Sequence, residues 1–416
     1  MLRLLIAATS LAWTFALLAT TTASAQDIGE ALCGDCKTTG RVAHEHKAKD
    51  LELEAEEIEY CSFFMRTNED VLGMDWVICA KCRTPSVQAS AKEDFDSEFG
   101  RRKKWLDERE SEADQPAGHR VEHIKTRHFL ISFDLPKIKV KRKAYNTHQA
   151  IHLYAERLEE LHAQMLMLHG ITESSTSRQV HRIYIFERDL TAKRVGNHVM
   201  SAGMGSGFRK TQYGPASVHI TNRDRKTLRK DEQFHQALVH SVSHIITNEI
   251  GILKKWLTKR YGWVNVGMAH WFEVHNFGPP ITWCHQEQGA FMHWKSKSWE
   301  ANVKKELLAG NAINFQEILG KSSETLDARA HQFSWSYVDY LMWLDPNKMV
   351  KFLTLIKGPQ LPERDALRQA YGITIGQFVE GWEEFVRTKY SMRPWKGPRV
   401  LPPRQPVEEP ESYGQR

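Results

Sequence analysis

Residues 238–248, "LVHSVSHIITN", carry two histidines, His240 and His244, four positions apart. Apolar residues around them recur with the period of a helix, which predicts a helix over 231–251. Side chains four residues apart lie on one face of a helix, one turn from each other. Two imidazoles in that arrangement can hold a metal ion if a neighbouring element supplies a third ligand. The stretch therefore predicts a helix with two candidate metal ligands.

The spacing alone is weak evidence for a metal site. The chain has 20 histidines among 416 residues, and at that frequency chance gives about one pair at this helical spacing. The pairs His119/His123 and His148/His152 have the same spacing. Histidines that pack in a core or lie on the surface explain such pairs as well as a metal does. A metal site at His240 and His244 therefore needs a third ligand from the elements around the helix.

The elements around this helix form an ordered series. In chain order, we predict a strand at 128–140, a long helix at 146–170, a strand at 178–189, a short strand near 217–221, the two-histidine helix, and a second helix at 264–278. This second helix lies in "YGWVNVGMAHWFE", which begins 17 residues after His244. From 299 to 391 the pattern is mostly helical and rich in Trp and Phe.

This layout resembles the gluzincin-like, thermolysin-type "peptidase MA" superfamily over roughly residues 125–392. In that family an H-E-x-x-H helix supplies two zinc ligands and a general base, and the next helix supplies a glutamate ligand. His240 and His244 match the two histidine ligands, and Trp263 and Gly267 match the pattern of the next helix. The resemblance implies an α+β domain with a mixed sheet, a two-histidine helix and a helical C-terminal lobe.

The two acids of the family pattern are missing from this chain. Ser241 stands where the family has its general base, and Val266 stands where it has the third ligand. Serine is a poor base at neutral pH and valine cannot bind a metal, so only vestigial positions remain and His240 and His244 would hold zinc weakly. We therefore expect a catalytically inactive metallopeptidase-like protein, a pseudopeptidase, with a binding or structural role.

The alternative is a zinc-dependent peptidase or other hydrolase with a non-standard ligand set. His270 lies one helical turn after Val266 on the same face, and Glu273 lies a further turn along. In this alternative His240, His244 and His270 bind the catalytic zinc.

Two C-x-x-C pairs near the N-terminus predict a second, structural zinc site. They are formed by Cys33, Cys36, Cys79 and Cys82. Two such turns direct four thiolates to one point, and "CGDCKTTGRV" resembles the knuckles of a zinc ribbon. Disulfides and a redox-active pair are the alternatives, because an exported protein can form them. Cys61, His44 and His46 lie between the pairs and could supply or exchange a ligand, whereas Cys284 reads as an isolated thiol.

The N-terminal 25 residues have the pattern of a secretory signal peptide. Arg3 precedes an apolar run that ends in Ala23-Ser24-Ala25. We expect export to a periplasm or to the extracellular space, with an uncleaved membrane anchor as the alternative. The expected organisation is a signal peptide at 1–25, a cysteine-rich zinc-ribbon-like module at 26–84, a charged helix or linker at 85–125, a metallopeptidase-like domain at 126–395 and a disordered tail at 396–416.

The composition bears on the kind of partner. The net charge is +6 over 416 residues, without a long Lys/Arg block, which argues against a nucleic-acid partner. No other segment has a transmembrane pattern, so we expect no membrane contact after signal cleavage. A protein or peptide partner is the remaining expectation. A third hypothesis assigns the main role to the cysteine module, as a protein–protein contact.

Overall fold

The computed structural model describes most of the chain after the N-terminal segment. The described residues are 33–37, 39–43, 58–171, 180–200, 209–213, 216–222, 230–248, 260–281, 298–358, 360–395 and 397–399. The predicted signal peptide, His44, His46 and Cys284 lie outside them, as does nearly all of the predicted tail. The chain divides into two compact units, a smaller one of Met1–Glu45 with Asp75–Ser97 and a larger one of His46–Met74 with Glu98–Arg416.

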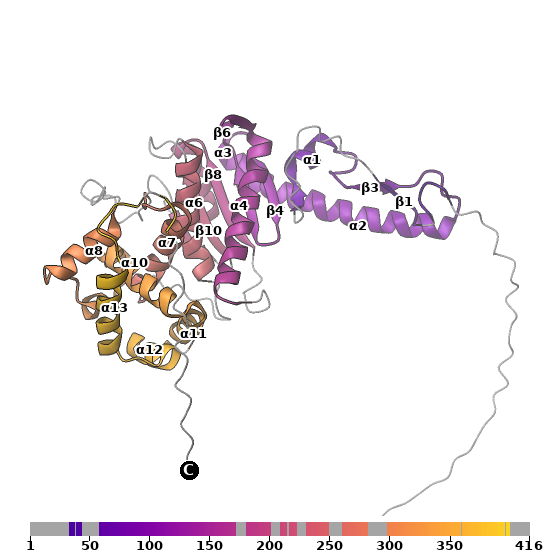
Figure 1. The fold of residues 1–416 in the computed structure, drawn as a ribbon. Coiled ribbons are helices and arrows are strands. Elements are labelled where there is room, and N and C mark those ends of the chain that lie inside the picture. Colours follow the sequence, from indigo (N-terminus) through magenta and orange to yellow (C-terminus); the bar gives the residue numbers. More distant parts are fainter. Residues whose placement is uncertain are drawn as a thin grey trace, which may run out of the picture. The chain divides into compact units, whose positions relative to one another are not determined.

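The smaller unit is built on a two-stranded antiparallel sheet and the start of a long helix. Strand β1 (Arg41–Ala43) pairs with β3 (Trp76–Ile78), so that Arg41 lies opposite Ile78 (Figure 1). The guanidinium of Arg41 lies over the ring of Trp76, 4.5 Å from its centroid. Helix α2 (Pro85–Arg109) begins in this unit and continues into the larger one.

A mixed six-stranded sheet is the centre of the larger unit. Its order is β2-β4-β5-β8-β10-β9. The strands are β2 (Ile58–Cys61), β4 (Glu122–Thr126), β5 (Phe129–Phe133), β8 (His181–Phe186), β10 (Ala216–Asn222) and β9 (Arg209–Tyr213). The neighbours β5, β8 and β10 run parallel, and the outer pairs are antiparallel. The predicted α+β class and mixed sheet are confirmed.

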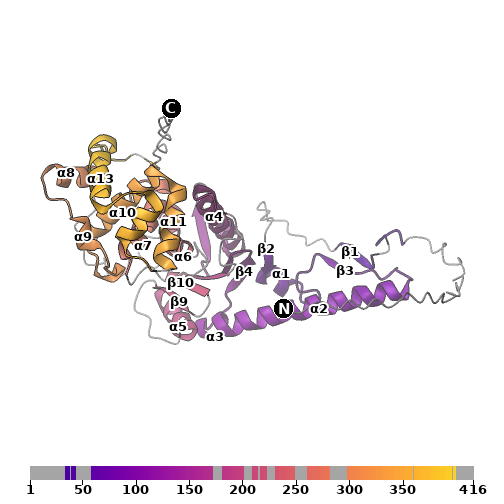
Figure 2. The same ribbon diagram turned by 90° about the horizontal axis from the view of Figure 1, so that it is seen from below.

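Helices cover both faces of this sheet, as the view from below shows (Figure 2). Strand β8 alternates between them, because successive side chains point to opposite faces. Ile183 and Ile185 belong to the main core with α4 (Thr147–Leu168) and α6 (Asp231–Thr247). Tyr184 and Phe186 pack in a separate cluster with α5 (Asp189–Met200). The predicted strand and the two predicted helices are therefore found where the periodicity placed them.

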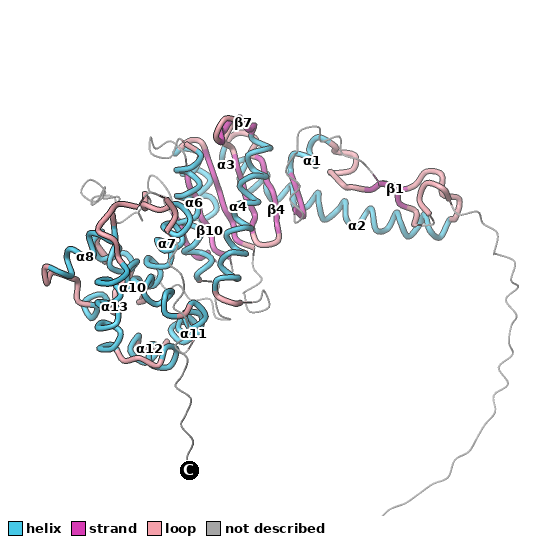
Figure 3. The backbone as a smooth tube through the Cα atoms, viewed as in Figure 1, coloured by secondary structure: helices cyan, strands magenta, loops and turns pink. Residues whose placement is uncertain are grey.

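The rest of the larger unit is helical, as predicted for residues 299–391 (Figure 3). Helix α7 (Gly262–Phe277) follows α6 and begins this part. It is followed by α8 (Trp299–Leu308), α9 (Phe315–Ile318), the 3₁₀ turn η5 (Ser323–Thr325), α10 (Ala328–Leu344), α11 (Pro346–Lys357), α12 (Glu363–Tyr371) and α13 (Ile375–Lys389). Buried aromatic side chains, among them Trp263, Trp299, Trp335 and Trp382, fill the space between the helices.

The segment at 85–125 is more than a charged linker. Its start is the exposed helix α2, but its second half contributes to the core of the larger unit. Trp105 and Leu106 pack with Met65, Leu72 and Leu130. The π-helical turn η1 (Glu110–Asp114) and α3 (Gln115–Ala117) then lead into the sheet strand β4. The predicted charged helix is therefore present as α2, and the segment also contributes apolar side chains to the core of the larger unit.

Short elements complete the fold. Helix α1 (Ser62–Thr67) follows β2 directly, and β6 (Lys137–Val140) forms a hairpin with β7 (Lys143–Asn146) before α4. The predicted strand at 128–140 is thus two strands separated at Pro136. Among the described residues, no helix is both long and apolar enough to cross a bilayer.

Candidate metal centres

Helix α6 is held at its start by a buried ion pair. Asp231 accepts hydrogen bonds from both terminal nitrogens of Arg157 on α4, at 2.7 and 3.0 Å, and from the Tyr154 hydroxyl at 2.9 Å. Burial raises the pKa of Asp231, but the hydrogen bonds from Arg157 outweigh it and leave the pKa below its ordinary value. The pair is therefore charged at neutral pH. It fixes α6 against α4, and with it the positions of His240 and His244.

Helix α7 approaches α10 closely because of a glycine. A Cβ added at Gly267 would lie 2.5 Å from the backbone oxygen of Ser334 and 2.5 Å from the Val338 side chain. Contacts that short do not occur between packed atoms, so a larger residue would force the helices apart. Gly267, which the resemblance matches to the pattern of the next helix, thus has a packing role, and it sets the position of the side chains on the other faces of α7.

Glu273 on α7 joins His240 on α6 and His270 on α7 in one buried cluster. Its Oε2 lies 3.1 Å from Nδ1 of His240 and 3.1 Å from Nδ1 of His270. Its Oε1 accepts hydrogen bonds from Gln236 Nε2 at 3.1 Å and from the backbone N–H of Ile281 at 2.8 Å. His240, His270 and Glu273 offer three donor atoms within 4.8 Å of one another, so the group could hold a metal ion.

His244 lies beside this cluster rather than in it. Its Nε2 is 3.2 Å from Nε2 of His240, and its Nδ1 is 2.6 Å from Oδ1 of Asn265. When Nδ1–H donates to Asn265, the Nε2 lone pair is directed at His240. A tetrahedral zinc ion holds two imidazole nitrogens about 3.3 Å apart. The His240–His244 pair has this spacing, but the group of three that the fold assembles contains Glu273 in place of His244.

The two vestigial positions are buried and carry no acid. Val266 has no exposed surface and packs in the main core. Ser241 is 3% exposed. Neither side chain supplies a carboxylate to the cluster, and the carboxylate that is present belongs to Glu273, seven residues beyond Val266 on the same face of α7.

Glu273 is not among the metal ligands predicted from the sequence. It is the single acidic residue of α7, whose other residues are mainly apolar, and it follows His270 by three positions. An isolated carboxylate on the buried face of a helix needs a partner, because an unpaired buried charge is costly. That rule applied to α7 identifies Glu273 from the sequence. Gln236, which contacts Glu273, and Asn265, which contacts His244, carry no such signal.

The cluster is enclosed. His240, His270 and Glu273 each have 0% exposed surface. A buried carboxylate needs compensating partners, and Glu273 has two imidazoles and two N–H donors around it. A hydrolytic zinc also needs an open coordination position that water and substrate can reach. The donor set of two imidazoles and a carboxylate therefore suits a metal ion.

Three cysteines of the smaller unit form a second cluster. Cys33, Cys36 and Cys79 have their sulfurs within 4.8 Å of one another, and Cys33 Sγ lies 3.7 Å from Cys79 Sγ. Cys82 packs in the same buried cluster. Among the described residues, Cys33, Cys36, Cys61, Cys79 and Cys82 form no disulfide with one another. Three sulfurs this close could hold a metal ion, and thiolates favour zinc over magnesium or calcium.

Tight turns bring the two C-x-x-C pairs together. The Lys37 N–H bonds the Cys33 carbonyl at 2.8 Å, and the Cys79 N–H bonds the Gly40 carbonyl at 2.8 Å. Gly40 has a φ of 70°, and a Cβ there would lie 2.9 Å from the Val87 carbonyl oxygen. Glycine is therefore required at this turn. Cys61 belongs to the larger unit and supplies no ligand to this cluster.

Comparison of the chain with protein-family models and with characterised proteins finds no match. The class that the structure itself defines is an α+β protein with a mixed sheet, a helical C-terminal part, and buried histidine–glutamate and cysteine clusters that could hold metal ions.

Proposed function

We propose that the chain is an exported, catalytically inactive metallopeptidase-like protein that serves in binding or in structure. The observation that carries the proposal is the enclosure of the α6–α7 cluster. His240, His270 and Glu273 have no exposed surface, so a metal held there has no open position toward a substrate. Val266 and Ser241 occupy the two positions where the resemblance expects acids, and neither side chain supplies a carboxylate there.

The order of elements supports the metallopeptidase-like assignment. Strand β5, helix α4, strands β8 and β10, and helices α6 and α7 follow one another in the predicted order. The mixed sheet packs against α6, and a helical part follows. The residue pattern and the order of the elements support the assignment. No similarity to a family model or to a characterised protein supports it.

In this proposal the metals stabilise the molecule rather than react. Zinc in the cysteine cluster replaces the hydrophobic core that a unit of this size lacks. The His240–Glu273–His270 group fixes α6 to α7, with or without a metal. The activity left to the protein is recognition of a protein or peptide partner.

The test is turnover of the purified, zinc-supplemented protein with unfolded casein and a mixed fluorogenic peptide library. We expect no cleavage above that of a His240→Ala variant. Cleavage that His240→Ala abolishes, and that a Cys33→Ser/Cys36→Ser variant retains, would overturn the proposal. The second variant shows that the loss does not come from general unfolding.

The convergence of His240, His270 and Glu273 supports a second candidate function. In this candidate the protein is a zinc-dependent hydrolase with an unusual ligand set. The predicted set of His240, His244 and His270 is replaced in this candidate by the three residues whose donor atoms lie within 4.8 Å. The same assay separates the two: a hydrolase loses turnover in Glu273→Gln, whereas the inactive protein shows none to lose.

A further inference from the structure

A second histidine pair lies in the first turns of α4. The Asn146 side chain accepts a hydrogen bond from the Gln149 N–H at 2.8 Å, and the Gln149 side chain accepts one from the Asn146 N–H at 3.2 Å. This reciprocal capping fixes the start of the helix. His148 and His152 project from it on one face, and only 8% and 3% of their surfaces are exposed.

Cys61 brings a thiol to this pair from a strand 87 residues earlier than His148. It ends β2 and directly precedes α1. Its Sγ lies 3.5 Å from Nε2 of His148 and 3.6 Å from Nε2 of His152, and the two Nε2 atoms are 3.0 Å apart. Three donor atoms from two distant segments therefore face one point.

These distances fit a zinc ion. Tetrahedral zinc with usual bond lengths holds a nitrogen and a sulfur ligand about 3.6 Å apart and two nitrogen ligands about 3.3 Å apart. Both nitrogen–sulfur distances agree, and the nitrogen–nitrogen distance of 3.0 Å needs only a small opening of the pair. One thiolate with two imidazoles is also a ligand set that selects zinc over magnesium and calcium.

The orientation of the His152 imidazole points to the same three atoms. The Nδ1 atom of His152 is buried with no hydrogen-bond partner among the described residues. Its imidazole is therefore oriented through Nε2, which faces Cys61 and His148.

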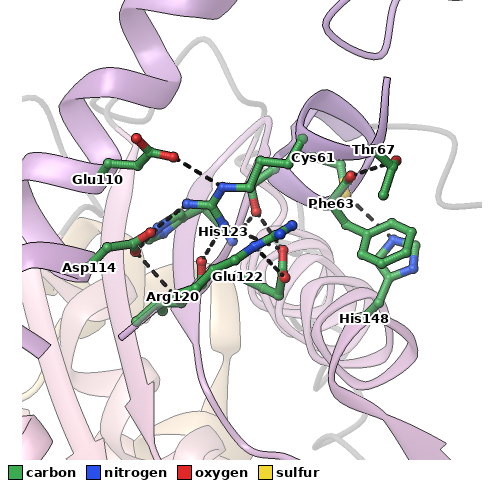
Figure 4. Close-up of polar contacts among 12 residues, drawn as sticks. Cys61, Phe63, Thr67, Glu110, Asp114, Arg120, Glu122, His123 and His148 are labelled. Carbon is green, nitrogen blue, oxygen red and sulfur yellow. Dashed lines mark hydrogen bonds and ion pairs between the residues drawn. The ribbon is translucent and has the colours of Figure 1, made fainter. Parts of the chain in front are cut away.

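Aromatic rings enclose the site on one side. The ring of Phe63 stacks on His148 at a centroid distance of 4.0 Å, as the close-up shows (Figure 4). Phe64 meets His148 and His152 edge-on, at 5.1 and 6.2 Å. Rings packed against metal ligands fix their orientation and keep the site dry, which strengthens metal binding.

A polar network holds the segment that carries Cys61. The Ser62 hydroxyl donates to Glu122 at 2.8 Å and accepts from the His123 N–H at 2.7 Å. Arg66, at the other end of α1, donates to Asp114 at 2.5 Å and to the Val121 carbonyl at 2.8 Å. Figure 4 shows Glu122, His123 and Asp114 gathered beside this turn. The thiol is thus held in place before any metal arrives.

We propose that Cys61, His148 and His152 bind one zinc ion. On binding, Cys61 Sγ and the two Nε2 atoms form bonds to the metal, and the thiol proton leaves to solvent. The ion fastens β2 and α1 to α4, and the site is independent of the α6–α7 cluster and of the cysteine cluster of the smaller unit.

Zinc content of the full chain tests the site. Cys61→Ser, His148→Gln and His152→Gln should each remove one zinc per chain, measured by mass spectrometry of the metal after dialysis. The control is His162→Gln, which changes a buried histidine of the same helix outside the cluster and should retain the wild-type content. Zinc content unchanged in all three ligand variants would overturn the proposal.

A cobalt spectrum decides the matter if those variants fail to fold. The protein for this experiment is the full-length chain that keeps Cys61 and has its other five cysteines replaced by serine. Bound Co²⁺ should give a thiolate-to-cobalt band in the near ultraviolet. Added zinc should displace the Co²⁺ and abolish the band. A folded protein, by circular dichroism, that binds no Co²⁺ through sulfur would overturn the site. Peptidase activity plays no part in either readout, so the proposed function stands or falls separately.

Discussion

Helices α4 and α6 carry the same local pattern and use it differently. In each, two buried histidines four residues apart bring their Nε2 atoms together, at 3.0 Å in α4 and 3.2 Å in α6. On α4 the pair meets the thiol of Cys61 from a distant strand. On α6 one member, His240, meets the carboxylate of Glu273 from the next helix. The comparison teaches that the spacing sets a shared face, whereas the partner brought by the fold sets the chemistry.

The third pair with this spacing shows what happens without a helix. His119 and His123 lie in the turn and strand after α3. His119 pairs with Asp134 at 3.1 Å, and His123 pairs with Asp114 at 2.8 Å. Because an extended chain rises about 3.3 Å per residue, and because a turn also redirects it here, four-residue spacing does not bring these two imidazoles together.

The largest loss of stability should come from removing the carboxylate that meets His240 of α6. Glu273→Ala leaves two imidazoles, Gln236 and a backbone N–H without their buried acceptor, which should lower the free energy of unfolding by about 3–5 kcal/mol. Urea unfolding measures it. Glu380→Ala, at an exposed position, is the control and should change little. Equal stability of the two variants would show that the cluster does not hold α6 to α7.

Acid should weaken the far end of α4. Burial lowers the pKa of His169 to about 4, whereas the unfolded chain keeps the ordinary value near 6.5. Above pH 6.5 the imidazole is neutral in both states, and below it the unfolded state binds the proton first. Stability should therefore fall between about pH 6.5 and 4, by up to about 3 kcal/mol. His169→Gln should flatten this slope in unfolding experiments; an unchanged slope would assign the titration to another group.

Removal of zinc tests the proposed metal site of Cys61, His148 and His152. In the protein whose single cysteine is Cys61, zinc at a hundredfold excess over its dissociation constant should stabilise the fold by about 2.7 kcal/mol. Thermal unfolding with zinc and with a chelator measures the difference. Cys61→Ser in the same background should abolish it. A zinc effect that survives Cys61→Ser would move the stabilising site to the α6–α7 cluster.

The smallest effect should come from the third pair. The His119 side chain is half exposed, whereas Asp134 is largely buried and also accepts a hydrogen bond from the Glu187 N–H, so His119→Ala should change stability by only about 1 kcal/mol. Metal content should stay at the wild-type level. A measurable loss of zinc in this variant would contradict the claim that helical spacing and a third donor are both needed.

Much of the fold was predictable because its signals are local. The helix expected over 146–170 is α4 with Asn146 as its cap, and the helix expected over 231–251 is α6. Strand β8 and the closing helices likewise follow from periodicity. The boundary expected at 84 does not coincide with the division of the chain, because β2 pairs with β4 across more than sixty residues. Such pairing leaves no trace in a local window.

The candidate metal sites were also only partly predictable from the sequence. Local residue patterns were enough to predict two C-x-x-C turns that meet, because each turn is a short, self-contained structure. They were also enough to place His240 and His244 on one helical face. Only the folded chain brings Glu273 to His240, and Cys61 to His148 and His152. These contacts join segments 33 and 87 or more residues apart, and packing of whole elements, rather than the propensity of any one residue, determines which side chains meet there.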